Sequence, residues 1–212
     1  MAGTAPKLRP PGGVRLPRGI GVRKRVFFGG VGRVTPYGKE RWSRMAVLKG
    51  ERVLLRPGRP EDADALVRIR KEPKVARRWG EADIEEEIGE GFIGTDEGFA
   101  IEVNGEVVGA IQYGEEEDPM YRHASVDIFL TTPRHGRGLG TEAIRVLARY
   151  LFEERGHHRL TIDPAADNAA AIRAYERAGF RRVGIMRSYE RGPDGAWHDG
   201  LLMDMLEEEF RP

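Results

Sequence analysis

Ten residues in the middle of the chain, 131–140, have the composition of a phosphate-binding loop. They read TTPRHGRGLG, in which two arginines lie among three glycines: Arg134, Arg137, Gly136, Gly138 and Gly140. Glycines let the backbone approach a ligand closely. A helical pattern follows directly, and the first turn of a helix presents unpaired N–H groups at the positive end of the helix dipole. This stretch therefore predicts a site for a phosphate-bearing cofactor.

The elements around the loop form one strand-helix-strand crossover. Residues 123–130 alternate as a strand, which places Asp127 on the same face as His123, Ser125 and Phe129. The periodicity then predicts three further elements, namely a helix over 138–156, a strand over 158–163 and a short helix over 167–179. Asp167 or Asn168 can cap the last helix, and a glycine ends it.

The rest of the chain supplies strands and helices to support this crossover. The patterns predict a first strand over 47–56, a helix over 60–79 interrupted near Pro73, a very acidic helix over 83–93, and hairpins over 98–113 and 180–206. Asn104 and Gly105 are the turn residues of the first hairpin, because both accept positive φ. The predicted fold class is α/β with a mixed sheet.

Two classes of cofactor fit the glycine-rich loop. Residues 138–143 match the dinucleotide fingerprint, and Asp163 follows about twenty residues later, as that interpretation requires. Seven residues separate the strand from Gly138, however, whereas a dinucleotide fold places the first glycine almost directly after the strand. The chain also lacks further parallel crossover units, which disfavours the dinucleotide.

The loop and the second helix together resemble the GNAT superfamily of acetyl-coenzyme A-dependent N-acetyltransferases. The shared pattern is His135-x-x-Gly138-x-Gly140, a strand, and then Asn168-x-x-Ala171-x-x-x-Tyr175 followed by Gly179-Phe180. His135 departs from the Gln or Arg usual there. The resemblance covers about residues 47–206 and implies about seven mostly antiparallel strands, a splayed pair at the fourth and fifth, and about four helices. It implies acetyl-coenzyme A as the cofactor.

The resemblance also assigns roles to residues of the site. Backbone groups of Ile128, Phe129 and Leu130 would bind the pantetheine arm. The pyrophosphate would lie on the loop and first helical turn, which comprise His135, Gly136, Arg137, Gly138, Leu139, Gly140 and Thr141. Asn168 and Ala171 match cofactor-contacting positions. Tyr175 matches the tyrosine that faces the sulfur and protonates it, and Asp127, beside the expected thioester, is the candidate base for the attacking amine.

The acceptor is less well defined than the donor. TIDPAADNAAAIRAYERAGF and RGLGT resemble the aminoglycoside 6'-N-acetyltransferase branch, whereas WHDGLLMDM is similar to the branch that acetylates ribosomal-protein N-termini. Acidic runs at 81–90 and 115–118 would attract a cationic amine. The residues predicted to contact the acceptor are Trp79, Glu115 and Asp127. A small amine, such as an aminoglycoside, is the first hypothesis, and a protein or peptide N-terminus is the alternative.

Composition divides the 212 residues into two parts. Residues 1–44 are rich in Gly, Pro and Arg and carry a net charge of +10, whereas the domain expected over 45–212 carries −9. The first part is interpreted as a disordered leader or an over-extended start, with a basic arm for nucleic acid as the other interpretation. In that case the chain would be a non-catalytic coenzyme A-binding or nucleic-acid-associated module.

Other residue types exclude several classes of protein. The chain has no cysteine, and its five histidines lack metal-site spacing, so we expect no metal site. His157 and His158 are expected on the surface at a helix end. No apolar run approaches the length of a membrane span, and a cytoplasmic enzyme is expected, with a homodimer left open.

Overall fold

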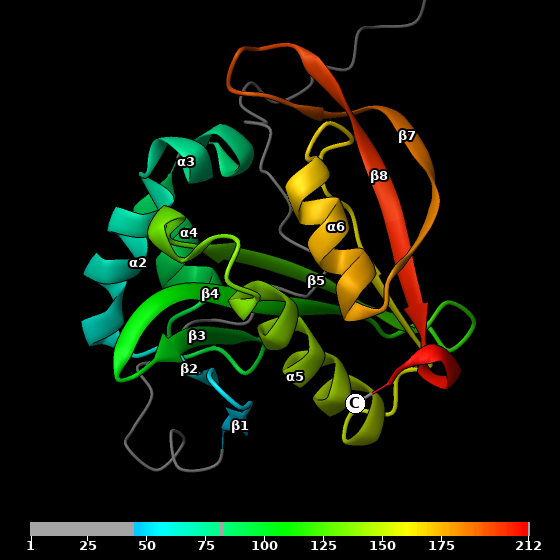
Figure 1. The fold of residues 1–212 in the computed structure, drawn as a ribbon, viewed down its shortest axis with the longest axis horizontal. Helices are drawn as coiled ribbons and strands as arrows, with labels where there is room; N and C mark the ends of the chain where they lie inside the picture. The colour runs from blue at the N-terminus through cyan, green and yellow to red at the C-terminus, as the bar shows by residue number, and fades with distance from the viewer. Residues whose placement is uncertain (1–44, 81–82, 212) are drawn as a thin grey trace, which may run out of the picture.

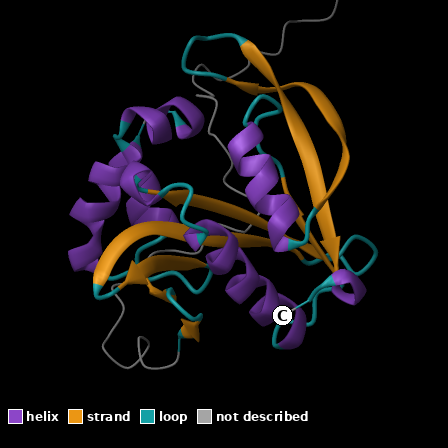
Figure 2. Ribbon diagram, in the orientation of Figure 1, coloured by secondary structure: helices purple, strands orange, loops and turns teal. Residues whose placement is uncertain are grey.

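The computed structural model describes residues 45–80 and 83–211, which form one eight-stranded sheet with helices on both faces (Figures 1 and 2). The strands are β1 (Leu48–Lys49), β2 (Leu54–Pro57), β3 (Gly98–Val103), β4 (Glu106–Glu116), β5 (His123–Leu130), β6 (Arg159–Ile162), β7 (Arg181–Arg191) and β8 (Trp197–Leu206). Their order in the sheet is β1-β2-β3-β4-β5-β6-β8-β7. The helices are α2 (Ala63–Arg70), α3 (Pro73–Trp79), α4 (Ile84–Gly91), α5 (Leu139–Glu153) and α6 (Ala169–Ala178). Short 3-10 turns lie at Pro60–Asp62, Thr132–Arg134 and Glu207–Glu209. The predicted α/β class with a mixed sheet is confirmed.

The sheet is nearly split in two between β5 and β6. These strands form its one parallel pair among the described residues, and only Ala124 with Leu160 and Ser125 with Thr161 are in register. Beyond that point the two strands diverge toward their carboxyl ends. In Figure 1, β3, β4 and β5 run across the view while the hairpin of β7 and β8 rises steeply, with α6 in the angle between them. This is the splayed pair that the sequence predicted.

Two hydrophobic clusters fix the helices to opposite faces of the sheet. The larger cluster joins α5 and α6 to the face of β5 that carries Ala124 and Val126, with Ile128 and Leu130 packed at its margin. The smaller one joins α2, α3 and α4 to Phe129 on the other face. Alternation along β5 therefore sends neighbouring residues into different layers, as the period of a strand requires.

Most predicted elements are present, with one correction at the start of the domain. Residues 47–56 do not form a single strand, because a turn at Gly50 folds β1 back on β2 and Gly50 N donates to Val53 O at 2.8 Å. The total is therefore eight strands rather than about seven. Asn104 and Gly105 have φ of 52° and 81°, so the predicted hairpin turn is confirmed. The predictions for residues 1–44 lie outside the described residues.

Candidate active site

The glycine-rich loop enters α5 with its backbone exposed. Gly136 and Gly138 have φ of 72° and 81°, a conformation that side-chain-bearing residues rarely adopt. The first helical hydrogen bond runs from Glu142 N to Gly138 O at 3.0 Å. The N–H groups of Leu139, Gly140 and Thr141 therefore have no acceptor within the helix and face the mouth of the loop, where an anion can bind them.

An ion pair from the β1–β2 turn holds this loop in place. Arg52 Nε donates to Glu142 Oε2 at 2.7 Å, and Arg52 Nη1 donates to the carbonyl of Arg137 at 2.9 Å. Glu142 Oε1 also accepts from the backbone N–H groups of Arg52 and Val53. Burial alone would raise the pKa of Glu142, but these hydrogen bonds outweigh it and hold that pKa below its usual value. The turn that replaced the predicted single strand thus supports the cofactor loop.

A second carboxylate fixes the junction between β5 and the loop. Glu72 accepts hydrogen bonds from Thr131 Oγ1 at 2.5 Å and from Thr132 N at 2.6 Å, and these bonds lower its pKa despite its partial burial. His135 Nε2 lies 2.8 Å from the carbonyl oxygen of Leu130. A carbonyl can only accept, so Nε2 carries a proton. His135 therefore ties the loop back to the end of β5.

The backbone of β5 presents polar groups to the gap between β5 and β6. Thr131 N donates to Val108 O at 2.8 Å, and in this register the N–H and C=O groups of Asp127 and Phe129 also point toward β4. Those of Ile128 and Leu130 consequently point the other way, where β6 has already diverged. An extended ligand lying in the gap can hydrogen-bond to the backbone groups of Ile128 and to the N–H of Leu130 as a strand would, whereas the Leu130 carbonyl already accepts from His135.

Tyr175 lies near this gap with Asp127 and Asp163, and Glu190 lies near Asp163. The hydroxyl of Tyr175 on α6 is desolvated, and the nearby charges of Asp127 and Asp163 raise its pKa further. Asp163 follows β6 directly; burial, and then the negative charge of Glu190 on β7, raise the pKa of Asp163 to about 7. Tyr175 therefore stays protonated near neutral pH, whereas Asp163 can exchange a proton there.

The carboxylates open onto a groove on the face of the sheet opposite α5. It is lined by His123 and Ser125 of β5, Thr161 and Arg159 of β6, and Asp163, Tyr189 and Leu202. Asp127 projects from the same face of β5 as His123 and Ser125. The gap between the strands therefore has a cofactor side at the α5 N-terminus and an acidic side that can receive a second substrate.

Two of the predicted cofactor residues lie at the start of α6. Asn168 is the N-cap, and its Oδ1 accepts from the N–H of Ala171 at 3.3 Å. This bond orients the Asn168 amide so that its NH2 group is the remaining donor. Tyr175 lies further along α6 and packs at the margin of the larger cluster. The single helix α6 thus positions all three residues relative to β5.

Trp79, predicted to contact the acceptor, is part of the smaller core cluster. Its ring makes an edge contact with Phe129, with centroids 5.2 Å apart, and the Arg70 guanidinium lies 5.0 Å from the Trp79 centroid. Arg70 is fully buried and pairs with Glu87 at 2.7 Å. Trp79 is half-buried at the end of α3, so it packs against β5 and leaves one edge accessible. Its contact with an acceptor stays a prediction.

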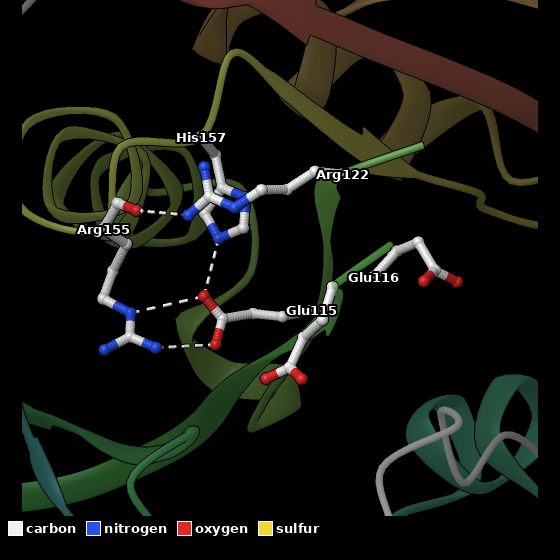
Figure 3. Close-up of a pocket in the computed structure, with 6 residues that line it drawn as sticks. Glu115, Glu116, Arg122, Arg155 and His157 are labelled. Carbon is white, nitrogen blue, oxygen red and sulfur yellow. Dashed lines mark hydrogen bonds and ion pairs between the residues drawn. The ribbon is translucent and has the colours of Figure 1, made fainter. Parts of the chain in front are cut away.

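Glu115 lies in a different pocket, at the other end of β5 from Leu130 (Figure 3). Its carboxylate accepts from Arg155 at 2.7 Å and contacts His157 Nε2 at 2.6 Å. The structure corrects the prediction that His157 is a surface histidine, since it is 1% exposed. Burial lowers the pKa of His157 although Glu115 opposes this. Substrate binding by Glu115 stays a prediction; in the structure its carboxylate is the partner of Arg155 and His157.

Sequence reasoning missed several residues that the fold brings to the site. The sequence suggested Asp163 only for a dinucleotide site, although it follows a strand parallel to β5 and, like Asp127, raises the pKa of Tyr175. Arg52, Glu72 and Glu190 reach the site through a turn, a helix junction and a hairpin. No local pattern marks such residues, because their partners are distant in sequence. Within the described ranges no cluster of side chains could hold a metal ion.

These features define a class of protein. Residues 52–181, which contain the loop before α5, the splayed strands and the capped helix with Tyr175, match the acetyltransferase (GNAT) domain model. The chain belongs to the GNAT acetyltransferase family, whose members use acetyl-coenzyme A. The residues present fit that cofactor: exposed N–H groups at the α5 N-terminus suit a pyrophosphate, and the outward groups of Ile128 and Leu130 suit an amide-containing arm.

Individual relatives share this domain. An aminoglycoside N(6')-acetyltransferase type 1 from Klebsiella pneumoniae is 35% identical over 105 residues, which are 44% of this chain and 49% of that protein. The chain thus matches about half the length of that relative. The solved structure of AAC(6')-Ib with ribostamycin and coenzyme A is 25% identical, with a TM-score of 0.60, over 75% of this chain and 96% of that one. A ribosomal-protein-S5-alanine acetyltransferase from Vibrio fischeri, 17% identical over 79% of this chain and 100% of that one, has a TM-score of 0.65 and shares the fold.

Proposed function

We propose that the protein transfers an acetyl group from acetyl-coenzyme A to a primary amine of a small polycationic acceptor such as an aminoglycoside. The observation that carries this proposal is the groove on the face of the sheet opposite α5: Asp163 lines it, Asp127 projects from the same face of β5 as its lining residues, and Glu190 adds negative charge at Asp163. Carboxylates held close together favour a bound cation, since it relieves their mutual repulsion. The 35% identity to an aminoglycoside acetyltransferase supports the same class of acceptor.

Each of the site residues has a separate role in the proposed acetyl transfer. Acetyl-coenzyme A supplies the acyl group as a thioester. The N–H groups at the start of α5 bind the pyrophosphate, and the outward N–H of Ile128 or Leu130 polarises the thioester carbonyl. Asp127 or Asp163 accepts the proton that an ammonium must lose before it can attack, and a pKa of about 7 suits Asp163 to that exchange. The Tyr175 hydroxyl donates a hydrogen bond to the departing sulfur.

An acetyl-transfer assay with purified full-length protein tests this proposal. The acceptors are a panel of aminoglycosides beside a library of peptides with free N-termini, with acetyl-coenzyme A as donor. Asp127→Asn and Asp163→Asn should each reduce kcat/KM for the aminoglycosides by about tenfold or more, while Glu153→Gln, exposed at the C-terminal end of α5, should not. Acetylation of peptides alone would replace the proposed acceptor with a protein N-terminus, which is the alternative indicated by the WHDGLLMDM segment.

The same experiment addresses a non-catalytic role. Binding of coenzyme A without transfer to any acceptor would favour a cofactor-binding module. Deleting residues 1–44 then asks whether the basic segment retains nucleic acid, since its net charge of +10 is the only support for that activity. Unchanged nucleic-acid retention after the deletion would remove that support.

A further inference from the structure

One ion pair crosses the gap between the two halves of the sheet at its open end. Arg78 Nη1 lies 2.5 Å from Asp167 Oδ1, although 89 residues separate them in the chain. Arg78 is in the last turn of α3, next to Trp79, whose ring is packed on Phe129 of β5. Asp167 lies in the segment between β6 and α6, next to the N-cap Asn168. The pair therefore joins structure attached to β5 with structure attached to β6.

Asp167 lies a few residues along the chain from the groove that is predicted to receive the acceptor. The segment that carries Asp167 begins at Asp163, and it is fixed to β8 by Ala166 N donating to Asp199 O and by Leu201 N donating to Pro164 O. Asp167 is therefore held on a supported backbone a few residues from the carboxylate that borders the groove. The Asp167 side chain is 67% exposed, and its carboxylate is therefore accessible to a cationic ligand that binds near Asp163.

We propose that Arg78 is an internal substitute for an acceptor ammonium group, and that a polycationic acceptor displaces it from Asp167. This inference rests on the proposed function, because it concerns the recognition of that same acceptor. An amine with several ammonium groups can place one at the reacting centre and another on Asp167. Acceptors with a single ammonium group leave the Arg78–Asp167 pair closed, so the exchange selects for multiple charges.

The exchange is feasible because the pair is only partly buried. The Asp167 side chain is 67% exposed and that of Arg78 is 28% exposed. Ion pairs at such sites contribute little net stability, since solvent screens the attraction. A ligand ammonium can therefore replace the guanidinium at small cost. The hydrogen bond from Arg78 and the positive potential of Arg77, the preceding residue of α3, keep the pKa of the Asp167 carboxyl below its usual value, so Asp167 stays ionised during the exchange.

Binding of ribostamycin to four variants tests the proposal, measured calorimetrically with coenzyme A present. Arg78→Ala removes the competing cation and should tighten binding by about two- to fivefold. Asp167→Asn removes the shared carboxylate and should weaken binding by a similar factor. The matched controls are Arg181→Ala and Glu209→Gln, which break an ion pair between the start of β7 and the turn Glu207–Glu209 and should leave the affinity unchanged.

The proposal requires that Arg78→Ala and Asp167→Asn change the affinity for ribostamycin in opposite directions. Weaker binding in Arg78→Ala, or equal affinity in Asp167→Asn and the parent, would overturn it, as would a failure of ribostamycin to bind any variant. Coenzyme A affinity, measured in the same samples, reports whether the proteins are folded and the cofactor site is intact. If coenzyme A binds and peptides are acetylated while ribostamycin does not bind, the transferase activity stands and this exchange is refuted.

Discussion

Asp163→Asn should make the protein more stable at high pH while it damages the site. The fold raises the pKa of Asp163 from 3.8 to about 7, first through burial and then through the charge of Glu190. The folded carboxyl thus keeps its proton up to about pH 7, whereas the unfolded chain ionises it near pH 4. Between these values the folded state binds more protons, so this group's contribution to the free energy of unfolding falls as pH rises.

The size of the effect follows from the pKa difference. A shift of about three units corresponds to roughly 4 kcal/mol of lost stability at pH 8, as an upper bound. Asp163 is half-buried, and solvent screening should reduce the loss to about 2 kcal/mol. Asparagine has nearly the shape of the protonated acid but no charge, so the variant should regain that amount at pH 8 and little at pH 4.

Chemical denaturation at pH 4.5, 6 and 8 measures this difference. The stabilisation by Asp163→Asn should grow steadily across the three values, and Glu190→Gln should produce part of the same trend by lowering the pKa of Asp163. Asp64→Asn, an exposed substitution on α2, is the control. A stabilisation that is equal at all three pH values would refute the reasoning, since it would show that Asp163 does not titrate between them.

Three further substitutions test other parts of the site. Tyr175→Phe should lower kcat by about tenfold to a hundredfold and leave coenzyme A affinity within about twofold, which steady-state kinetics and calorimetry separate. Glu142→Gln should weaken coenzyme A binding by about tenfold, because Arg52 would no longer hold the loop; a change confined to kcat would contradict this. The pKa of buried His157 is lowered, so the protein should lose stability as pH falls below about 6.5, and Glu115→Gln should steepen that loss in thermal melts.

The sequence predicted the parts of the site that local patterns encode. The loop before α5 and the capped helix with Tyr175 are each specified by residues close together in the chain, so their types and spacing were sufficient. The splay at β5 and β6 came from the family resemblance, because no periodicity shows where two strands diverge. The structure supplies its cause, a parallel pairing that ends after Ser125 and Thr161.

The remaining features depend on contacts between distant residues. His157 looks like a solvent-exposed histidine after a helix, yet it is buried against Glu115, 42 residues earlier. Arg52 was predicted to lie in a continuous strand. Polar and apolar residues alternate in the same way on both sides of a tight turn, so the pattern does not reveal the turn. Arg78 looks like an ordinary surface charge and Asp167 like a candidate helix cap until the fold brings the two together. Only the tertiary structure contains this information.

The short pairing between β5 and β6 also affects the stability of the folded protein. Among the described residues, the two halves of the sheet share a seam of two residue pairs, and the outward groups of Ile128 and Leu130 lie beyond it. A cofactor that lies along those groups takes the place of a neighbouring strand. Part of the stability of the folded protein therefore depends on cofactor binding. Stability then rises with cofactor concentration by mass action. We therefore expect limited proteolysis to cut the protein faster without coenzyme A than with it.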